Sequence, residues 1–278
     1  RGHRVTLFDR AALPGGQLRL ARRVPGKEEF QTLLDWFATR LRHPEIRLRL
    51  GAQVSARDLA GFDRVIVATG TRPRDPGIPV DPGAPVLGYA EALQGAPVGR
   101  RVAIIGAGGI GFDVATALVG AGTGAPPDLA QWRRDWGVAA PWQHRGGLVP
   151  DGPAPQKSPR EVHLLQRKPE RPGRDLGKTT GWIHRSHLAL HGVRMLGGVQ
   201  YDRITADGLI LRQGADAAPV LLPVDSVVLC AGQVPETGLS ENLTRLGIAH
   251  HRIGGADQAT GLDARRAIDQ ALRLVAGF

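Results

Sequence analysis

The sequence is poor in cysteine, and this scarcity excludes several kinds of redox chemistry. Its 278 residues include one cysteine, Cys230. A single thiol cannot form an internal disulfide or a CxxC pair, and it cannot build a thiolate-ligated metal site from this chain alone. If electrons pass through the protein, we therefore expect bound cofactors to carry them.

Lysine, aromatic residues and long apolar runs are also scarce. Only four of the 36 basic residues are lysine, aromatics make up 5% of the chain, and the net charge of +10 comes almost entirely from arginine. This composition favours an arginine bias over a nucleic-acid surface, for which we would expect a basic stripe interleaved with aromatics. No apolar run approaches the ~20 residues that span a bilayer, and residues 1–10 have a strand pattern instead of a signal-peptide pattern. We expect a cytoplasmic protein with neither nucleic acid nor membrane as a partner.

The sequence contains an alternation of short apolar strands and helical patterns. Runs rich in Val, Ile and Leu are typical of buried parallel strands, and apolar residues at helical spacing follow several of them. We predict strands at 5–8, 65–67, 102–105, 162–165 and 227–229, a shorter one before Gly254, and helices at 27–42 and 110–119. This alternation predicts a doubly wound α/β fold. Residues 120–160, with their Gly, Pro and Trp, read as a long ordered insertion.

One Gly-rich loop, GAGGIG at residues 106–111, lies between an apolar strand and a helical pattern. In a dinucleotide-binding loop of this type Gly106 permits the tight turn, Gly108 lets the pyrophosphate approach the backbone, and Gly111 lets the helix pack on its strand. The helix N-terminus offers N–H groups and a positive dipole end to the phosphates. The alternative is an ordinary turn in a chain with 38 glycines. The surrounding strand and helix favour dinucleotide binding.

The end of the following strand indicates which dinucleotide is bound. An acidic residue there would bind the ribose 2′-OH of NAD, whereas a basic residue would accept a 2′-phosphate. The strand VHLLQ is followed by Arg167 and Lys168. Two cations and no carboxylate favour NADPH over NADH, although a basic, solvated strand end in an arginine-rich protein is the alternative.

The beginning of the chain carries part of a second nucleotide site. The strand RVTLFD ends in Asp9, where a second Rossmann strand presents its ribose-binding acid, and the matching glycine loop is expected about 20 residues upstream. The turn PGGQ at 14–17 follows shortly after. The segments VIVATG, VVLCAG and IGGAD each end a strand in small residues, which let a flat cofactor and a crossing chain come close. Asp257 in IGGAD would suit a ribityl hydroxyl of FAD.

Several residues that resemble functional groups have a simpler interpretation. His184, His187 and His191 suggest a metal cluster, but no third ligand at a fixed spacing stands out, so we predict no metal site. Cys230 ends an apolar strand without an identifiable base and is interpreted as a buried packing residue. The segment GKTTGWIHR at 177–185 is rich in hydroxyls and cations. The sequence favours neither a role in binding the nucleotide nor the absence of such a role.

These motifs together resemble a known family. The strings VAIIGAGGIG, GKTTGWIHR, VVLCAGQ, IGGAD and LDARRAI, with PGGQ and PGKEEF near the start, are similar to the C-terminal part of bacterial NADPH-dependent 2,4-dienoyl-CoA reductase. The likeness extends over essentially all 278 residues. It implies two dinucleotide-binding domains and an electron path from NADPH to FAD, then to a 4Fe-4S cluster and to FMN in an N-terminal barrel.

The resemblance implies an NADPH domain at about 96–231, with the insertion at about 120–160, placed within an FAD domain formed by 1–95 and 232–278. It also implies that the barrel, the cluster cysteines, and the first strand and glycine loop of the FAD domain are missing from this chain, and that no residue here reduces the substrate. The positions that match are Asp9, Gly16, Gln17, Gly255, Asp257 and Ala264 for FAD, and Gly106, Gly108, Gly111, Arg167 and Lys168 for NADPH.

Three functional hypotheses follow. The leading one is the electron-input part of a 2,4-dienoyl-CoA reductase, which would transfer hydride from NADPH to FAD and work with the missing barrel and iron–sulfur segment. A second is a stand-alone electron-transfer module that reduces a partner protein, and a third is a truncated remnant without FAD. A disulfide reductase of similar fold is disfavoured by the single cysteine.

Overall fold

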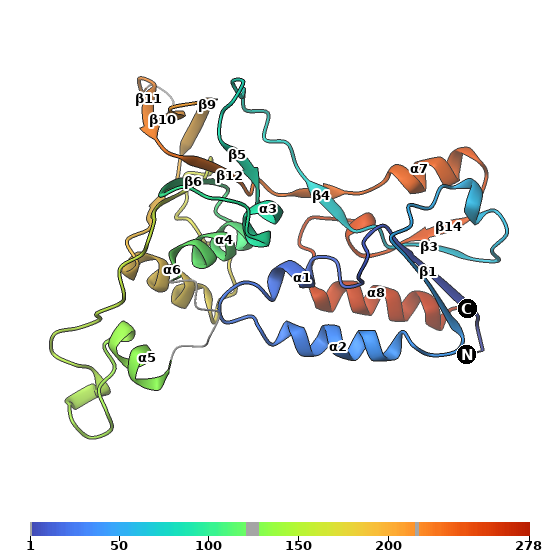
Figure 1. Cartoon of the computed structure of the whole chain (residues 1–278), viewed down its shortest axis with the longest axis horizontal. Coiled ribbons are helices and arrows are strands. Elements are labelled where there is room, and N and C mark those ends of the chain that lie inside the picture. Colours follow the sequence, from blue (N-terminus) through green and yellow to red (C-terminus); the bar gives the residue numbers. More distant parts are fainter. Residues whose placement is uncertain (1, 121–127, 215–216) are drawn as a thin grey trace. The chain divides into compact units, whose positions relative to one another are not determined.

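The computed structural model of the protein describes residues 2–120, 128–214 and 217–278 (Figure 1). The chain forms two compact units. Unit 1 comprises Arg1–Gly16, Thr32–Asp75 and Gly232–Phe278, and unit 2 comprises Gln17–Gln31 and Pro76–Ala231. These units assign residues 17–31 and 76–95 to unit 2, whereas the sequence placed them in an FAD domain. Where the cofactor-binding domains begin and end stays a prediction.

Unit 2 is built on a five-stranded sheet with the order β5-β12-β6-β7-β8, in which every neighbouring pair is parallel. Its strands are β5 (Val86–Gly88), β6 (Arg101–Ile105), β7 (Glu161–Leu165), β8 (Arg194–Leu196) and β12 (Ser226–Leu229). Both faces of the sheet are covered, so most residues pointing to either side are apolar, with His163 and Ser226 as buried polar exceptions. Val102 and Ile104 of β6 face one core, Ala103 and Ile105 face the other, and all four are 2% exposed or less.

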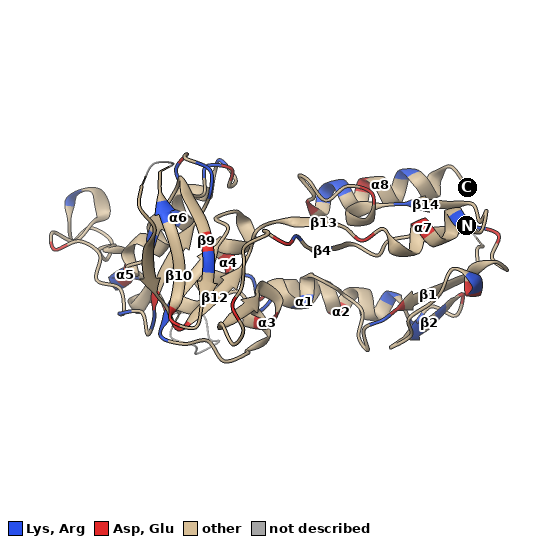
Figure 2. Cartoon of the chain, turned by 90° about the horizontal axis from the view of Figure 1, so that it is seen from above, with Lys and Arg blue, Asp and Glu red and all other residues tan. Residues whose placement is uncertain are grey.

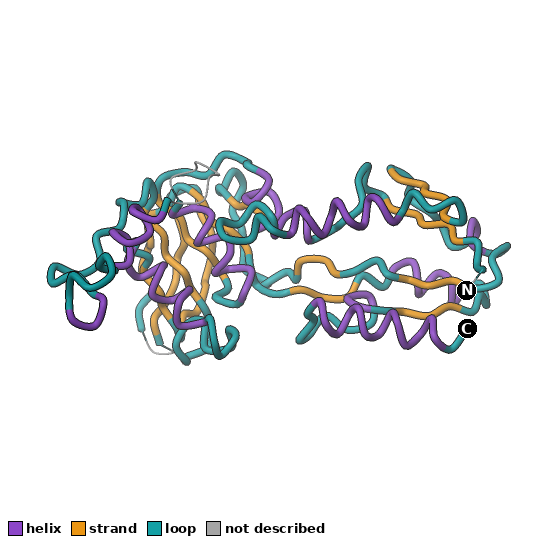
Figure 3. The backbone as a smooth tube through the Cα atoms, turned by 90° about the horizontal axis from the view of Figure 1, so that it is seen from below, coloured by secondary structure: helices purple, strands orange, loops and turns teal. Residues whose placement is uncertain are grey.

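Helices cover one face of this sheet and an antiparallel sheet covers the other. The helical layer consists of α3 (Tyr89–Gln94), α4 (Gly109–Val119) and α6 (Gly181–Leu190), which contribute Tyr89, Phe112 and Leu188 to the first core. The opposite layer consists of β9 (Val199–Thr205), β10 (Gly208–Gln213) and β11 (Val220–Pro223) in the order β11-β10-β9. Figure 3 shows these strands and helices of unit 2 as orange and purple tubes.

The remaining elements of unit 2 are short. Helix α1 (Leu18–Ala21) brings Leu20 against the first core. The proposed insertion contains α5 (Leu129–Trp136) and the 3-10 turn η2 (Arg145–Gly147), and Val138 bridges Leu148 across a loop. Residues 121–127 of the insertion lie outside the described residues.

Unit 1 contains two pairs of parallel strands. One pair is β1 (Val5–Asp9) with β2 (Ile46–Leu50), and the other is β3 (Val65–Val67) with β14 (His250–Arg252). Its helical elements are α2 (Phe30–Arg40), which belongs to the unit from Thr32 on, η1 (Arg57–Leu59), α7 (Gly238–Arg245), η3 (Gly254–Ala256) and α8 (Ala264–Ala276). The core of the unit gathers Val65, Val67, Leu59, Leu243 and Ala256, with Phe8 packed against it.

Two further strands of unit 1 pair antiparallel. They are β4 (Thr71–Pro73) and β13 (Gln233–Pro235), in a register that places Thr71 opposite Pro235 and Pro73 opposite Gln233. The ladder is extended by a hydrogen bond from the Arg74 N–H to the Gly232 carbonyl at 3.0 Å. The side chains of Thr71 and Gln233 also hydrogen-bond to each other, at 2.5 Å.

The α/β class and the strands expected from the sequence are confirmed. The six strands predicted correspond to β1, β3, β6, β7, β12 and β14, and the two predicted helices correspond to α2 and α4. No helix in the described part of the chain is long and apolar enough to cross a membrane.

Candidate dinucleotide-binding site

The Gly-rich loop connects the carboxyl end of β6 to the first turn of α4. Gly106 has φ +113°, a conformation that favours glycine, and a Cβ on it would overlap the carbonyl of Cys230 at the end of the neighbouring strand β12. A Cβ on Gly111 would overlap the carbonyl oxygen of Gly106 and meet Leu164 at 3.4 Å. These two glycines are therefore required by the close packing of α4 and β12 around the loop.

Gly108 has a different environment. It is exposed, its φ of −85° is open to any residue, and a Cβ built on it would meet nothing within 4 Å. Among the described residues no packing contact explains a glycine here, so the space beside its backbone is open to a ligand. Gly108 also caps α4, whose first N–H groups have no carbonyl partner within the helix and lie at its positive dipole end. This arrangement fits a pyrophosphate.

The two predicted cations lie at the same edge of the sheet as the glycine loop. β7 pairs with β6 so that Leu165 is opposite Ile105, and the Gly106 N–H donates to the Leu165 carbonyl at 2.8 Å. Arg167 and Lys168 follow two and three residues later and are exposed. The structure thus brings together the glycine loop and the basic strand end.

Each of the two cations has a neighbour in the structure. The Arg167 guanidinium donates to the Pro76 carbonyl at 2.9 Å and lies 5.5 Å from the ring centroid of Tyr201. The Lys168 ammonium is 3.2 Å from Asp175, and both side chains are more than 70% exposed. An exposed pair of this kind contributes little stability, so Lys168 is free to turn to a competing anion.

Other polar groups near the loop were missed at the level of sequence. Lys27 forms an ion pair with Asp113 of α4, with its Nζ 2.6 Å from Oδ1. The Gln166 side-chain amide donates to the Lys168 carbonyl, and Gly197 lies against the same carbonyl. The pair Gly197-Gly198 between two strands does indicate a turn in the sequence. The sequence does not indicate which residues that turn contacts.

In unit 1 the strand-ending segments VIVATG and IGGAD converge. The Ile253 N–H donates to the Val67 carbonyl at 3.1 Å, which continues the β3–β14 pairing. Gly255 is buried, and a Cβ on it would come within 2.6 Å of the Thr71 side chain and 3.0 Å of the Gly70 backbone. Small residues here therefore permit two chain segments to cross closely, as the sequence suggested.

The acidic residues proposed for FAD lie on different elements of unit 1. Asp9 ends β1 and its Oδ1 accepts the Ala11 N–H at 2.9 Å. Asp257 is exposed after η3, and its Oδ2 accepts from the side chain of Gln270 in α8 at 2.9 Å. Ala264 is the first residue of α8, directly after the cap Asp263.

The two remaining FAD candidates are in the PGGQ turn, which the division into units splits. Gly16 ends the first segment of unit 1 and has φ +46°. Gln17 begins the first segment of unit 2, and its side-chain amide hydrogen-bonds to the Tyr89 hydroxyl at 2.9 Å. A ligand that binds the Gln17 amide has to compete with this bond.

Cys230 is buried in unit 2, as the sequence indicated. Burial raises the pKa of its thiol to about 12, and Asp113 adds to the effect. A thiol that stays protonated at neutral pH is a poor nucleophile. Cys230 therefore acts through packing, and its carbonyl closes on Gly106.

The three histidines of the GKTTGWIHR region gather around α6 without forming a metal site. The rings of His187 and His191 are 4.3 Å apart between centroids, and Trp136 of α5 stacks on His187 at 6.4 Å. Within residues 2–120, 128–214 and 217–278, no three His, Cys, Asp or Glu side chains are placed to hold a metal ion. Burial lowers the pKa of His187 to about 4, with further contributions from His191 and His184 against an opposing one from Asp135.

This lowered pKa predicts acid sensitivity. Since His187 binds its proton less readily in the folded protein than in the unfolded chain, stability is complete above about pH 6.5 and falls as the pH drops toward 4. We expect His187→Gln to flatten this acid limb by up to about 1.4 kcal/mol per pH unit, the limit for one proton. Urea unfolding between pH 4 and 7 measures it. His144→Gln, at an exposed position, is the control, and an equal flattening in both variants would contradict the prediction.

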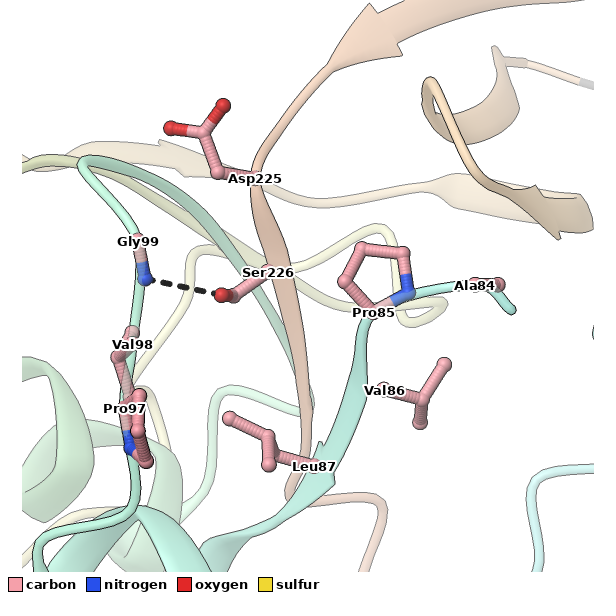
Figure 4. Close-up of a pocket in the computed structure, with 9 residues that line it drawn as sticks. All are labelled: Ala84, Pro85, Val86, Leu87, Pro97, Val98, Gly99, Asp225 and Ser226. Carbon is pink, nitrogen blue, oxygen red and sulfur yellow. Dashed lines mark hydrogen bonds between the residues drawn. The ribbon is translucent and has the colours of Figure 1, made fainter.

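A cavity of about 410 Å³ lies at the opposite edge of the same sheet (Figure 4). It is lined by Val86, Leu87 and Val98 among others, and by Asp225 and Ser226 at the start of β12. Its polar groups are already bonded. Ser226 Oγ accepts the Gly99 N–H at 3.0 Å, and Asp225 accepts from Arg101, which lowers the pKa of that carboxyl. Ligands of open parallel sheets bind at the carboxyl ends of strands, so the cavity is separate from the candidate site.

Charged residues are spread over both units. Figure 2 shows Lys and Arg interspersed with Asp and Glu on elements of each unit. The candidate site itself carries a local excess of positive charge, because Arg167, Lys168, Arg171, Arg174 and Lys178 outnumber Glu170 and Asp175 in the segment between β7 and α6. This local charge suits an anionic ligand.

The parallel sheet, the glycine loop at its carboxyl edge and the helix that begins there define an α/β dinucleotide-binding protein. The family model for the pyridine nucleotide-disulphide oxidoreductases matches residues 1–260. The chain therefore belongs to this oxidoreductase family. Its lone cysteine cannot supply an intrachain disulfide of its own.

Known proteins similar to the chain are longer than it is. A metal reductase of Desulforamulus reducens is 26% identical over 87% of this chain and 36% of its own length. A probable ferredoxin reductase of Castellaniella defragrans is 30% identical over 77% of the chain and 48% of its own length. Among solved structures, a 2-naphthoyl-CoA reductase in complex with 2-naphthoyl-CoA matches with a TM-score of 0.76 at 19% identity, over 99% of this chain and 36% of that one. The chain thus spans between a third and a half of these proteins.

Proposed function

We propose that the chain is the electron-input part of a reductase, which passes hydride from NADPH to FAD. The observation that carries this proposal is the loop of Gly106, Gly108 and Gly111, placed beside Arg167 and Lys168 at one sheet edge. The packing of unit 2 accounts for Gly106 and Gly111 but not for Gly108. When bound, NADPH supplies a hydride from nicotinamide C4 and FAD accepts it at N5, which requires no acid or base from the protein.

The residues of unit 2 then hold the nucleotide. The N–H groups at the start of α4 and the bare backbone at Gly108 receive the pyrophosphate. Arg167 and Lys168 receive the 2′-phosphate, with the guanidinium suited to bidentate bonding and the ammonium acting as a point charge. Residues 96–231 would form this NADPH domain, and 1–95 with 232–278 the FAD domain. Asp9, Gly16, Gln17, Gly255, Asp257 and Ala264 are the proposed FAD contacts.

The reductase we propose is a 2,4-dienoyl-CoA reductase, with FMN and a 4Fe-4S cluster carried outside this chain. The motif resemblance supports this, and so does the likeness in fold to a reductase solved with an aromatic acyl-CoA. The alternative is a module that reduces a partner electron carrier, which the likeness to a probable ferredoxin reductase favours. Steady-state assays of the full-length protein, which measure the rate of NADPH oxidation with either 2,4-dienoyl-CoA or a ferredoxin as acceptor, distinguish the two.

Nucleotide preference is tested by replacing the two cations together. We expect Arg167→Ala with Lys168→Ala to weaken NADPH binding by roughly 30- to 100-fold, since two charge-assisted contacts at about 1.5–3 kcal/mol each are lost and partly replaced by water. NADH binding should change by less than about threefold, because NADH has no 2′-phosphate. Isothermal titration with both nucleotides measures the difference. Arg203→Ala with Lys157→Ala removes the same charge elsewhere in unit 2 as the control, and equal losses of both nucleotides in the site variant would contradict the 2′-phosphate assignment.

A further inference from the structure

The segment that carries Lys168 is held by its backbone. The carbonyl of Lys168 accepts the Gly198 N–H at 2.8 Å and the Gln166 side-chain amide at 3.1 Å. The same Gln166 nitrogen donates to the Glu170 carbonyl at 2.6 Å. One side chain therefore ties the first and last carbonyls of a three-residue stretch to the end of β7.

Gln166 is itself fixed to the sheet. Its N–H donates to the Leu196 carbonyl at 3.0 Å and its carbonyl accepts the Val199 N–H at 3.0 Å, so the residue is bonded on both sides to the turn between β8 and β9. This leaves the side-chain amide little freedom in where it can place its two hydrogen bonds. The strength of these bonds is modest, but removing the amide leaves two carbonyls without this donor.

Gly197 leaves room for the same carbonyls. A Cβ on Gly197 would come within 2.7 Å of the Glu170 oxygen, 3.0 Å of the Lys168 oxygen and 3.1 Å of the Pro169 oxygen. All three carbonyls of the stretch thus face the turn between β8 and β9. Both cationic side chains are exposed, and they extend from a backbone in which the Lys168 and Glu170 carbonyls are already hydrogen-bonded.

We propose that Gln166 is a positioning residue for dinucleotide specificity: by holding the backbone of Arg167 to Glu170 through the Lys168 and Glu170 carbonyls, it presents the two cations to the 2′-phosphate of a phosphorylated adenosine. This rests on the proposed NADPH site. Gln166 does not touch the phosphate, so its loss lowers affinity for 2′-phosphorylated ligands while leaving the pyrophosphate contacts at Gly108 intact.

Two substitutions remove the bridging amide in different ways. Gln166→Leu keeps the size of the side chain and removes its donor, and Gln166→Asn keeps the amide on a stem one carbon shorter that cannot reach both carbonyls. The probes are adenosine 2′,5′-bisphosphate and adenosine 5′-monophosphate, which differ only in the 2′-phosphate. We expect both variants to lose roughly tenfold in affinity for the bisphosphate, about 1.4 kcal/mol, with the monophosphate changed less than about twofold. Gln94→Leu, at an exposed helix end, is the control.

Isothermal titration on the intact protein, with thermal unfolding to verify that each variant is folded, decides among the outcomes. If a folded Gln166 variant keeps the wild-type ratio of bisphosphate to monophosphate affinity, the role of Gln166 is overturned. If that ratio falls only in the variant that lacks Arg167 and Lys168, the proposed function still stands. Equal loss for both probes identifies a merely structural role and also overturns the inference. A wild-type protein without preference for the bisphosphate overturns the 2′-phosphate site and this inference together.

Discussion

Gly111→Ala is expected to lower the free energy of unfolding of unit 2 by more than about 3 kcal/mol. The added Cβ would overlap the Gly106 carbonyl oxygen, and the Leu164 side chain is 3.4 Å away from it. Neither can move easily, because Gly106 is bonded to β7 and Leu164 is fully buried. Helix α4 would have to shift away from β6. Urea unfolding followed by circular dichroism measures the loss, and hydrogen exchange of the α4 amides assigns it to unit 2.

Gly108→Ala is the matched control with the opposite expectation. The same chemical change here meets nothing within 4 Å and needs no unusual backbone angle, so stability should change by less than about 1 kcal/mol. Nucleotide affinity should nevertheless fall by roughly 100-fold, because the methyl group would occupy the approach of the pyrophosphate. Unchanged NADPH binding in a folded Gly108→Ala protein would exclude a dinucleotide from this loop.

Phe112→Ala is expected to have a similarly large effect on stability, about 3–5 kcal/mol, since it empties a fully packed aromatic position. Phe112 is 2% exposed and belongs to the first turns of α4. Its ring also supports the segment between β7 and α6, because a Cβ added at Gly173 would come within 2.6 Å of its Cζ. The substitution should therefore weaken NADPH binding as well as folding.

Phe112→Leu separates the two contributions. It keeps most of the buried volume, so a loss of only about 1 kcal/mol is expected, with NADPH affinity near that of the wild type. Chemical unfolding and isothermal titration on both variants provide the comparison. A loss below about 1 kcal/mol for Phe112→Ala would show that the cavity collapses and that the ring is not the support we describe.

Of the five strands in the parallel sheet of unit 2, the sequence predicted β6, β7 and β12, whose physical signal is local, but not β5 and β8 at the two edges. β6 and β7 are buried on both faces, so a run of four buried residues identifies each of them without knowledge of the partner strands; the run is apolar throughout in β6 and is interrupted only by His163 in β7. The glycine loop was recognised for the same reason, since a tight turn, a bare backbone and a close helix each demand glycine within six residues. The geometry at Gly106 and Gly111 agrees with the roles expected from the spacing.

The antiparallel sheet β9-β10-β11 and helix α8 were not predicted. β11 has exposed and half-buried residues along its length, and β9 alternates irregularly, so neither shows a clean period of two. The chain near α8 was interpreted through family motifs, and its strong amphipathic pattern was not used. The assignment of residues 17–31 and 76–95 to unit 2 was also not predicted, because it depends on which distant segments pack together.

The charged residues and glycines of the candidate site could be predicted from the sequence. The residues that hold them in place could not. Arg167 and Lys168 stand out because they follow a strand directly. Gln166 could not be recognised in the same way. Its side chain bonds to main-chain carbonyls, which every residue has, and the turn that packs against those carbonyls lies about thirty residues further along the chain. Contacts of this kind are read only from the folded backbone.

The pairing of β4 with β13 has a practical consequence for protein engineering. Because the Arg74 N–H and the Gly232 carbonyl are 3.0 Å apart, the chain leaves unit 1 and returns to it at nearly the same point. A short connector between residues 74 and 232 could therefore close the backbone without disturbing the β4–β13 ladder. Residues 17–31 also belong to unit 2 and bury Val24 in its first core, so a segment exchanged at positions 74 and 232 has to keep the surface that covers Val24.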